Sequence, residues 1–204
     1  THSSREWASR YVMRRPSPAE LAEAEMERLV MELEEEFHQF EIVNKDDSIF
    51  MKLIDVFLWV FTFGGMGAFM DNYVTTIGTT MYVPDDWVAR PAYSKATLLR
   101  HERVHMRQSK KYGRFFFVLF YLCFPLPAGL AWGRMRIERA AYEESMRARA
   151  EYDGIEVLYQ LKHTMVRKFT GPDYLWMWPF RSRMERWYDG FVADLERELD
   201  AKKG

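Results

Sequence analysis

The sequence has a single cysteine, Cys123, so no disulfide can form within the chain. Cys123 stands inside an apolar run, which favours a buried, inert thiol over a nucleophile. The chain also has no excess of either charge, because 29 basic and 30 acidic residues leave a formal net charge of -1. No global field attracts nucleic acid or an anionic membrane, and we expect no nucleic-acid partner.

The sequence also lacks a clear membrane-spanning segment. The uncharged run Val56–Met70 is shorter than the roughly 20 residues that cross a bilayer, and Phe115–Trp132 is interrupted by Pro125 and Pro127. We therefore favour buried core helices or an apolar hairpin over membrane insertion. No apolar segment of signal-peptide length follows Thr1–Trp7, so we expect no cleavable signal and a cytoplasmic protein or part of a virus particle.

Helical patterning is abundant. Residues 18–40 have apolar residues at helical spacing and many glutamates between them, which predicts an acidic amphipathic helix with a solvated acidic side. The segment Tyr73–Val83 is rich in β-branched and aromatic residues and predicts two short strands bent at Gly78. The aromatic loop Tyr174–Phe180 is expected to pack against the core. Further helices are expected at 92–111, 128–152, 155–167 and 183–201. These elements predict a mostly helical α+β fold in a single domain, 1–204.

The motif His101-Glu102-Arg103-Val104-His105 lies in the predicted helix 92–111. Histidines four residues apart on a helix lie on the same face, so His101 and His105 can direct ring nitrogens at one metal ion. They share a stripe with Gln108, whereas the basic residues of this helix gather on the opposite side. The histidines are therefore predicted to face inward and to bind zinc; ordinary interior histidines are the competing interpretation.

A catalytic zinc ion usually has three protein ligands, and Glu138 is the best candidate for the third. It lies on the apolar side of the helix predicted at 128–152, with Met135, Ala141, Tyr142 and Ser145. An inward glutamate paired to an arginine is the alternative. If Glu138 lay elsewhere, the next candidates would be Glu143, Glu144 and His163.

The His-Glu-x-x-His motif with Gln108, followed by Glu-x-x-Ala-Tyr at Glu138–Tyr142, resembles the zincin metallopeptidases of the gluzincin type. In that group the third ligand is a glutamate on a later helix, and an extended strand before the motif helix lines the substrate cleft. The resemblance implies a zincin-like core at about 70–155, between an N-terminal helix at 18–40 and a C-terminal helical region at 155–201. One departure is Arg103, because many zincins have uncharged residues between the two histidines.

The predicted function is zinc-dependent hydrolysis of a peptide bond in a peptide or protein substrate. Zn2+ held by His101, His105 and Glu138 would activate a water molecule, and Glu102 would act as the general base. Tyr142 would orient Glu138 or help to stabilise the oxyanion. The substrate would add to the edge of the strand at 73–83.

Two other functions stay open. One is a non-catalytic structural or binding component of a large assembly, such as a virus particle. Such a protein keeps a zincin-like domain, and its partners in the assembly order the charged ends of the chain. The other is a membrane-peripheral protease, for which the two apolar runs are the only support. Membrane contact is not favoured by the sequence.

Overall fold

The computed structural model describes residues 17–61, 74–113, 117, 131–172 and 176–202. Within them the chain is mostly helical with one small sheet, which confirms the predicted α+β class. The α-helices are α2 (Pro18–Glu36), α3 (Ile49–Phe61), α5 (Ala92–Tyr112), α7 (Trp132–Asp153), α8 (Glu156–Thr170) and α9 (Arg181–Ala201). The strands are β1 (Glu41–Asn44), β2 (Thr75–Ile77) and β3 (Thr80–Val83), and the short 3-10 helices are η1 (Lys45–Asp47) and η2 (Asp85–Trp87). The charged ends of the chain, 1–16 and 203–204, lie outside the described residues.

Local signals account for the ends of the helices. At the start of α2 the Ser17 hydroxyl accepts a hydrogen bond from the Glu20 N–H, and the Glu20 carboxylate accepts one from the Ser17 N–H. Helices α5 and α7 each end before a glycine with φ of 82°, at Gly113 and Gly154, a backbone conformation that other residues rarely adopt. The helices predicted from the sequence therefore form close to their expected positions.

Residues 37–44 differ from the prediction. Helix α2 ends at Glu36 and not near residue 40, because Phe37 is extended and Gln39 adopts a left-handed φ of 72°. The chain then turns into β1, a strand that the sequence did not predict. Strand β1 pairs in parallel with β3, with Glu41 opposite Thr80.

Strands β2 and β3 are the two short strands expected around Gly78. They are antiparallel, and Gly78 between them has a φ of 68°, as the bend requires. The strand order is β1-β3-β2, so β3 is paired on both sides and β2 forms one edge of the sheet.

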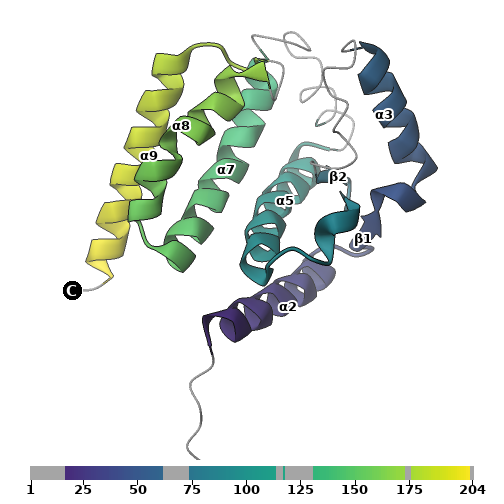
Figure 1. Ribbon diagram of the computed structural model, residues 1–204, viewed down its shortest axis with the longest axis horizontal. Helices are drawn as coiled ribbons and strands as arrows, with labels where there is room; N and C mark the ends of the chain where they lie inside the picture. Colours follow the sequence, from purple (N-terminus) through teal and green to yellow (C-terminus); the bar gives the residue numbers. More distant parts are fainter. Residues whose placement is uncertain (1–16, 62–73, 114–116, 118–130, 173–175, 203–204) are drawn as a thin grey trace, which may run out of the picture.

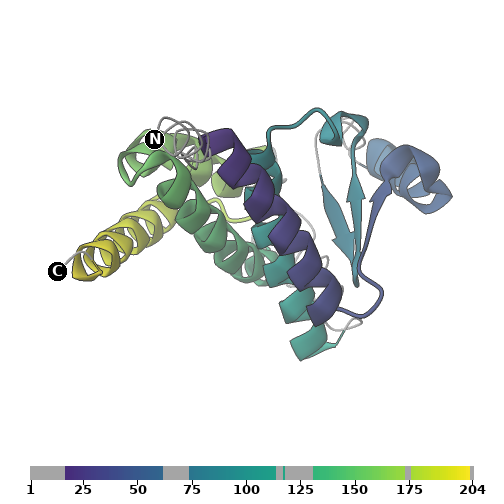
Figure 2. The ribbon, with the colours of Figure 1, turned by 90° about the horizontal axis from the view of Figure 1, so that it is seen from below.

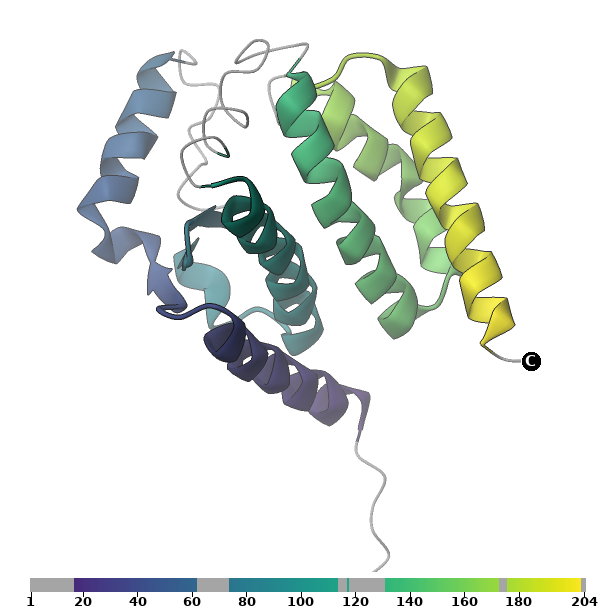
Figure 3. The same ribbon diagram turned by 180° about the vertical axis from the view of Figure 1, so that it is seen from behind.

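Helix α5 lies at the centre of the molecule, with α2 against one side and α7 against another (Figures 1 and 3). Figure 2 shows α2 lying across α5, with the sheet and α3 to one side and α7, α8 and α9 to the other. One apolar core, which includes Leu33, Met81 and Leu99, joins α2, β3 and α5. A second core, which includes Met146 and Phe169, joins α7, α8 and α9. The candidate metal ligands lie between these cores, on α5 and α7.

Helix α3 contradicts the expectation that the run from Val56 would be buried in the core. Val56 and Trp59 are more than half exposed, as are Ile49 and Leu53 on the same helix. Among the described elements, α3 packs mainly against η1, which leaves these side chains exposed. The remainder of that run and most of Phe115–Trp132 lie outside the described residues, so the predicted hairpin stays a prediction. None of the described helices is both long and apolar enough to cross a bilayer.

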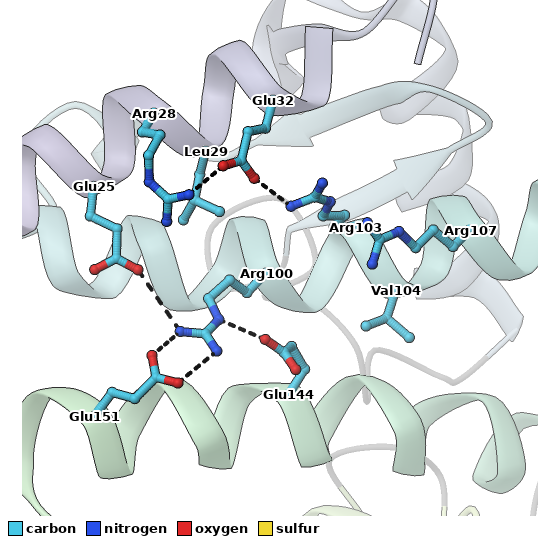
Figure 4. Close-up of a pocket in the computed structure, with 10 residues that line it drawn as sticks. All are labelled: Glu25, Arg28, Leu29, Glu32, Arg100, Arg103, Val104, Arg107, Glu144 and Glu151. Carbon is cyan, nitrogen blue, oxygen red and sulfur yellow. Dashed lines mark hydrogen bonds and ion pairs between the residues drawn. The ribbon is translucent and has the colours of Figure 1, made fainter. Parts of the chain in front are cut away.

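The acidic side of α2 is not simply solvated, which corrects a second expectation. The Arg103 guanidinium donates to Glu32 and to Glu36, each at 2.7 Å, and the Arg107 guanidinium donates to Glu36 at 2.6 Å. Figure 4 shows Arg103 directed at Glu32, while Arg100 is directed at glutamates of α7. The basic side of α5 is therefore the partner of the acidic side of α2.

The aromatic loop before α9 is only partly packed. Met177 is fully buried, but Trp176 and Phe180 are exposed by 52% and 44%, contrary to the expectation for the whole loop. The Ala131 N–H donates to the Met177 carbonyl at 2.8 Å, which fixes this loop beside the start of α7.

Candidate metal centre

The three predicted ligands come together between α5 and α7. The helices are antiparallel, since Arg100 near the start of α5 contacts Glu151 near the end of α7, and Gln108 near the end of α5 reaches Ile137 near the start of α7. His101 and His105 lie one turn apart on the side of α5 that faces α7, and Glu138 faces them. All three side chains are buried, with at most 9% of each residue exposed.

The distances between the ligand atoms suit a small cation. The two histidine Nε2 atoms are 3.1 Å apart, and the Glu138 Oε2 atom is 3.6 Å from His101 Nε2 and 3.7 Å from His105 Nε2. A point equidistant from the corners of this triangle lies about 2.0 Å from each atom, which is the length of Zn–N and Zn–O bonds. The three side chains therefore could hold a metal ion with bonds of this length.

A hydrogen bond with Ser145 holds the Nδ1 side of the His101 ring. The Ser145 hydroxyl donates to the Ala141 carbonyl at 3.2 Å, which uses its one proton. The same hydroxyl oxygen lies 3.0 Å from His101 Nδ1 and accepts there when Nδ1 carries the proton. The lone pair of Nε2 is left for the ion, as in the metal-ligating histidines of other proteins.

Gln108 holds the Nδ1 side of the His105 ring in a similar way. Its amide nitrogen donates to the Ile137 carbonyl at 3.2 Å, which turns the amide oxygen toward His105 Nδ1 at 3.1 Å. The oxygen can only accept, so His105 Nδ1 is protonated and Nε2 faces the ion. Gln108 also links α5 to α7 at the residue before Glu138. Neither Gln108 nor Ser145 was given a role from the sequence. The available signal was a polar residue on the ligand face of the helix, one turn after His105 for Gln108 and two turns after Glu138 for Ser145.

The charges of the centre favour a bound cation. Burial by itself would lower the pKa of His105, but the Glu138 carboxylate outweighs burial and raises this pKa to about 9. Burial by itself would raise the pKa of Glu138, but the two histidines hold it well below its usual 4.5. Two Nε2 lone pairs 3.1 Å apart would repel each other, so a proton or a metal ion is favoured between them.

Glu102 is buried on α5 beside the first histidine and is near enough to His105 to contribute to its raised pKa. Within the described part of the chain, its carboxylate is not among the three atoms that converge on the ion position. This placement agrees with a carboxylate beside a metal ion that does not bind it. The role of general base itself stays a prediction.

Tyr142 is also buried, and its ring packs edge-on against the His101 ring with centroids 4.9 Å apart. On its other side it contacts the Phe169 ring, at 5.3 Å. The ring therefore holds His101 in place by packing, whereas the predicted roles of orienting Glu138 or stabilising an oxyanion stay predictions.

The reserve candidates for the third ligand do not converge on the histidines. Glu143 accepts a hydrogen bond from the Trp187 indole, Glu144 pairs with Arg100, and His163 is exposed on α8. Arg103, the departure from many zincins, faces α2, so its charge is directed away from the centre.

Comparison with protein-family models, with curated proteins and with solved structures found no match to this chain. The interpretation of the centre therefore depends on its own geometry.

Proposed function

We propose that this chain is a zinc-dependent metallopeptidase of the gluzincin type, with His101, His105 and Glu138 as the ligands. The observation that supports the proposal best is the triangle of 3.1, 3.6 and 3.7 Å between two imidazole nitrogens and a carboxylate oxygen. Two nitrogen ligands and one oxygen ligand form a donor set typical of catalytic zinc, which keeps a fourth position open. Hydrogen bonds at the Nδ1 atoms of both histidines add to this support, because they leave both Nε2 atoms directed at the ion position.

When bound, a zinc ion would supply the Lewis acidity that lowers the pKa of a water molecule to about 7 and polarises the peptide carbonyl. Glu102 is the residue we assign to the proton. Its carboxylate takes a proton from the water as the oxygen attacks the carbonyl carbon. It then delivers that proton to the amine nitrogen as the C–N bond breaks. The products are a carboxylate and an amine.

The substrate is proposed to be an extended peptide that pairs with the outer edge of β2. Strand β3 is paired on both sides, so within the described sheet β2 is the strand next to α5 that still has an open edge. Main-chain hydrogen bonds to such an edge depend little on the substrate sequence. Broad sequence tolerance is therefore expected on that side of the scissile bond.

The test is the variant Glu102→Gln with two separate measurements. Elemental analysis of protein purified without chelators should give about one zinc per chain in both wild type and variant, because Glu102 is not a ligand. Cleavage of a quenched fluorescent peptide library should fall by about 100-fold to 10,000-fold in the variant, the usual contribution of a general base. Glu144→Gln, which changes a glutamate paired to Arg100, is the matched control and should keep both metal and activity.

Two results would contradict the proposal. Wild-type protein with less than about a tenth of a zinc per chain would remove the metal centre, for which one ion per site is expected. A variant that loses metal in proportion to activity would make Glu102 a ligand and not the base.

A further inference from the structure

One end of the helical part of the molecule is strongly basic. The end of α5, the start of α7, the end of α8 and the start of α9 lie together, as the contacts of Gln108 with Ile137 and of Ala131 with Met177 show. Figure 1 shows the starts of α7 and α9 and the end of α8 along one edge of the molecule. We call this the basic end and define it as residues 108–113, 131–137, 166–172 and 176–185. Its basic residues outside the core are Lys110, Lys111, Arg136, Arg167, Lys168, Arg181 and Arg183. Arg134 is buried, and the single acidic residue, Glu185, pairs with Arg181.

The opposite end is acidic, so the molecule is polarised although its net charge is close to zero. Residues 92–97, 148–160 and 192–202, where α5 starts and α7 and α9 end, have seven acidic side chains against four basic ones. A binding partner with a negative surface would therefore be drawn to one end only. The net charge considered in the sequence analysis does not reveal this separation.

Large aromatic side chains are exposed at the basic end. Tyr112 is 55% exposed, Trp176 52%, Phe180 44% and Trp132 41%. Cations lie over three of these rings: Lys111 over Tyr112 at 5.4 Å, Arg136 over Trp132 at 5.9 Å and Arg183 over Phe180 at 5.4 Å. Exposed aromatic rings with adjacent basic groups are typical of surfaces that enter the headgroup region of a bilayer.

We propose that the basic end docks on the surface of a membrane that contains anionic phospholipid. Lys and Arg side chains would contact the lipid phosphates, and the exposed rings of Tyr112, Trp132, Trp176 and Phe180 would enter the interface. A bilayer is favoured over nucleic acid because three of the four exposed rings are tryptophan or tyrosine, the residues enriched at membrane–water interfaces.

The position of the metal centre gives this docking a consequence, which rests on the proposed function. Glu138 lies six residues along α7 from Trp132, and His105 lies seven residues along α5 from Tyr112. At 1.5 Å per residue the centre is roughly 10 Å from the docked end. Peptide segments near a bilayer, such as those of membrane-anchored proteins, are then the substrates within reach.

The test is sedimentation of the full chain with two kinds of vesicle. One is phosphatidylcholine alone, and the other contains roughly 30% phosphatidylglycerol, enough anionic lipid to attract basic segments. Binding is expected to the anionic vesicles and should weaken at high salt. The double variant Lys110→Glu/Lys111→Glu should weaken binding by about 25-fold or more, since each lost cation is worth about fivefold. Trp132→Ser should weaken it by about tenfold through lost apolar contact.

The matched control is Arg197→Glu/Lys202→Glu, which makes the same change of charge at the acidic end and should bind as wild type does. Circular dichroism should show all variants folded, because the substituted residues are exposed. Three results would each overturn the proposal. The control pair could weaken binding equally, the chain could fail to sediment with anionic vesicles, or it could bind a short single-stranded oligonucleotide more tightly than vesicles. Glu102→Gln should bind vesicles normally, so loss of peptidase function and loss of docking are separate results.

Discussion

Two sides of helix α5 carry charged or polar clusters of opposite character. On the side facing α2, Arg103 and Arg107 each meet a carboxylate of Glu32 or Glu36. On the side facing α7, His101 and His105 direct their Nε2 atoms toward each other and toward one carboxylate. Both clusters join α5 to a neighbouring helix, and both were visible in the sequence as stripes.

The difference lies in whether the groups pair one to one or converge on a single point. Each guanidinium on the α2 side is neutralised by a carboxylate in direct contact, and the pairs are partly open to solvent, so they contribute modestly to stability. On the α7 side two imidazole nitrogens and a carboxylate oxygen converge on one point, which a proton or a metal ion can occupy. Convergence of donor atoms, and not the presence of charge, distinguishes a candidate site from an ion-paired interface.

Removal of the Glu138 carboxylate should have the largest effect of the changes considered, a loss of zinc affinity. Glu138→Ala takes away one of three ligands, so the zinc dissociation constant should rise by well over 100-fold, more than the roughly 10-fold to 100-fold typical of residues behind the ligands. A competition titration with a chromophoric chelator measures it.

Glu144→Ala is the control for Glu138→Ala, because it removes a glutamate of the same helix that pairs with Arg100. Its zinc affinity should be unchanged. If Glu138→Ala bound zinc as tightly as this control, the third ligand would have to come from another residue.

A smaller effect is expected from Gln108→Ala, which leaves all three ligands in place. His105 loses the acceptor for its Nδ1 proton, so its ring orientation is no longer fixed and zinc affinity should fall about 10-fold to 100-fold. Gln108→Glu keeps an acceptor at that position and should restore most of the affinity in the same titration. Equal affinities for wild type and Gln108→Ala would show that packing alone orients His105.

The smallest effect is expected from breaking an ion pair between α2 and α5, and it is an effect on the stability of the fold. The hydrogen bond from Arg107, assisted by Arg103, lowers the pKa of Glu36 from 4.5 to about 2 in spite of partial burial. A lowered pKa in the folded state stabilises the fold above pH 4.5, and that contribution is lost as the pH falls toward 2. Glu36→Gln should therefore cost about 1 kcal/mol at neutral pH.

Chemical denaturation at several pH values tests this expectation. The difference between Glu36→Gln and wild type should shrink as the pH falls through this range. Glu35→Gln, a change of the exposed neighbouring residue, should have little effect at any pH. A cost from Glu36→Gln that did not vary with pH would mean that shape and not charge holds α2 on α5.

The sequence predicted the converging cluster well because its ligands occupy regular helices. A spacing of four residues places His101 and His105 on one face whatever surrounds them, and the apolar side of α7 directed Glu138 inward. The partner of the acidic side of α2 was not predictable in the same way. A helical pattern shows that Glu32 and Glu36 share a side, but not which element lies against that side.

Strand β1 was missed for a related reason. It is four residues long and half polar, and it is stabilised by pairing with β3, which lies far along the chain. Local sequence carries little information about such a strand. The exposure of Val56 and Trp59 on α3 was likewise unpredictable, because burial depends on which elements pack nearby.

The parallel pairing of β1 with β3 also bears on the order in which the chain folds. Glu41 meets Thr80 only after the intervening chain, including all of α3, has been brought round, whereas α7, α8 and α9 are consecutive helices that pack on their neighbours. Contacts between distant parts of a chain form slowly, because the entropy of closing the loop is lost before the pairing stabilises it. We expect the C-terminal helices to acquire protection from hydrogen exchange first and the sheet last, with α5 docking onto α7 in between.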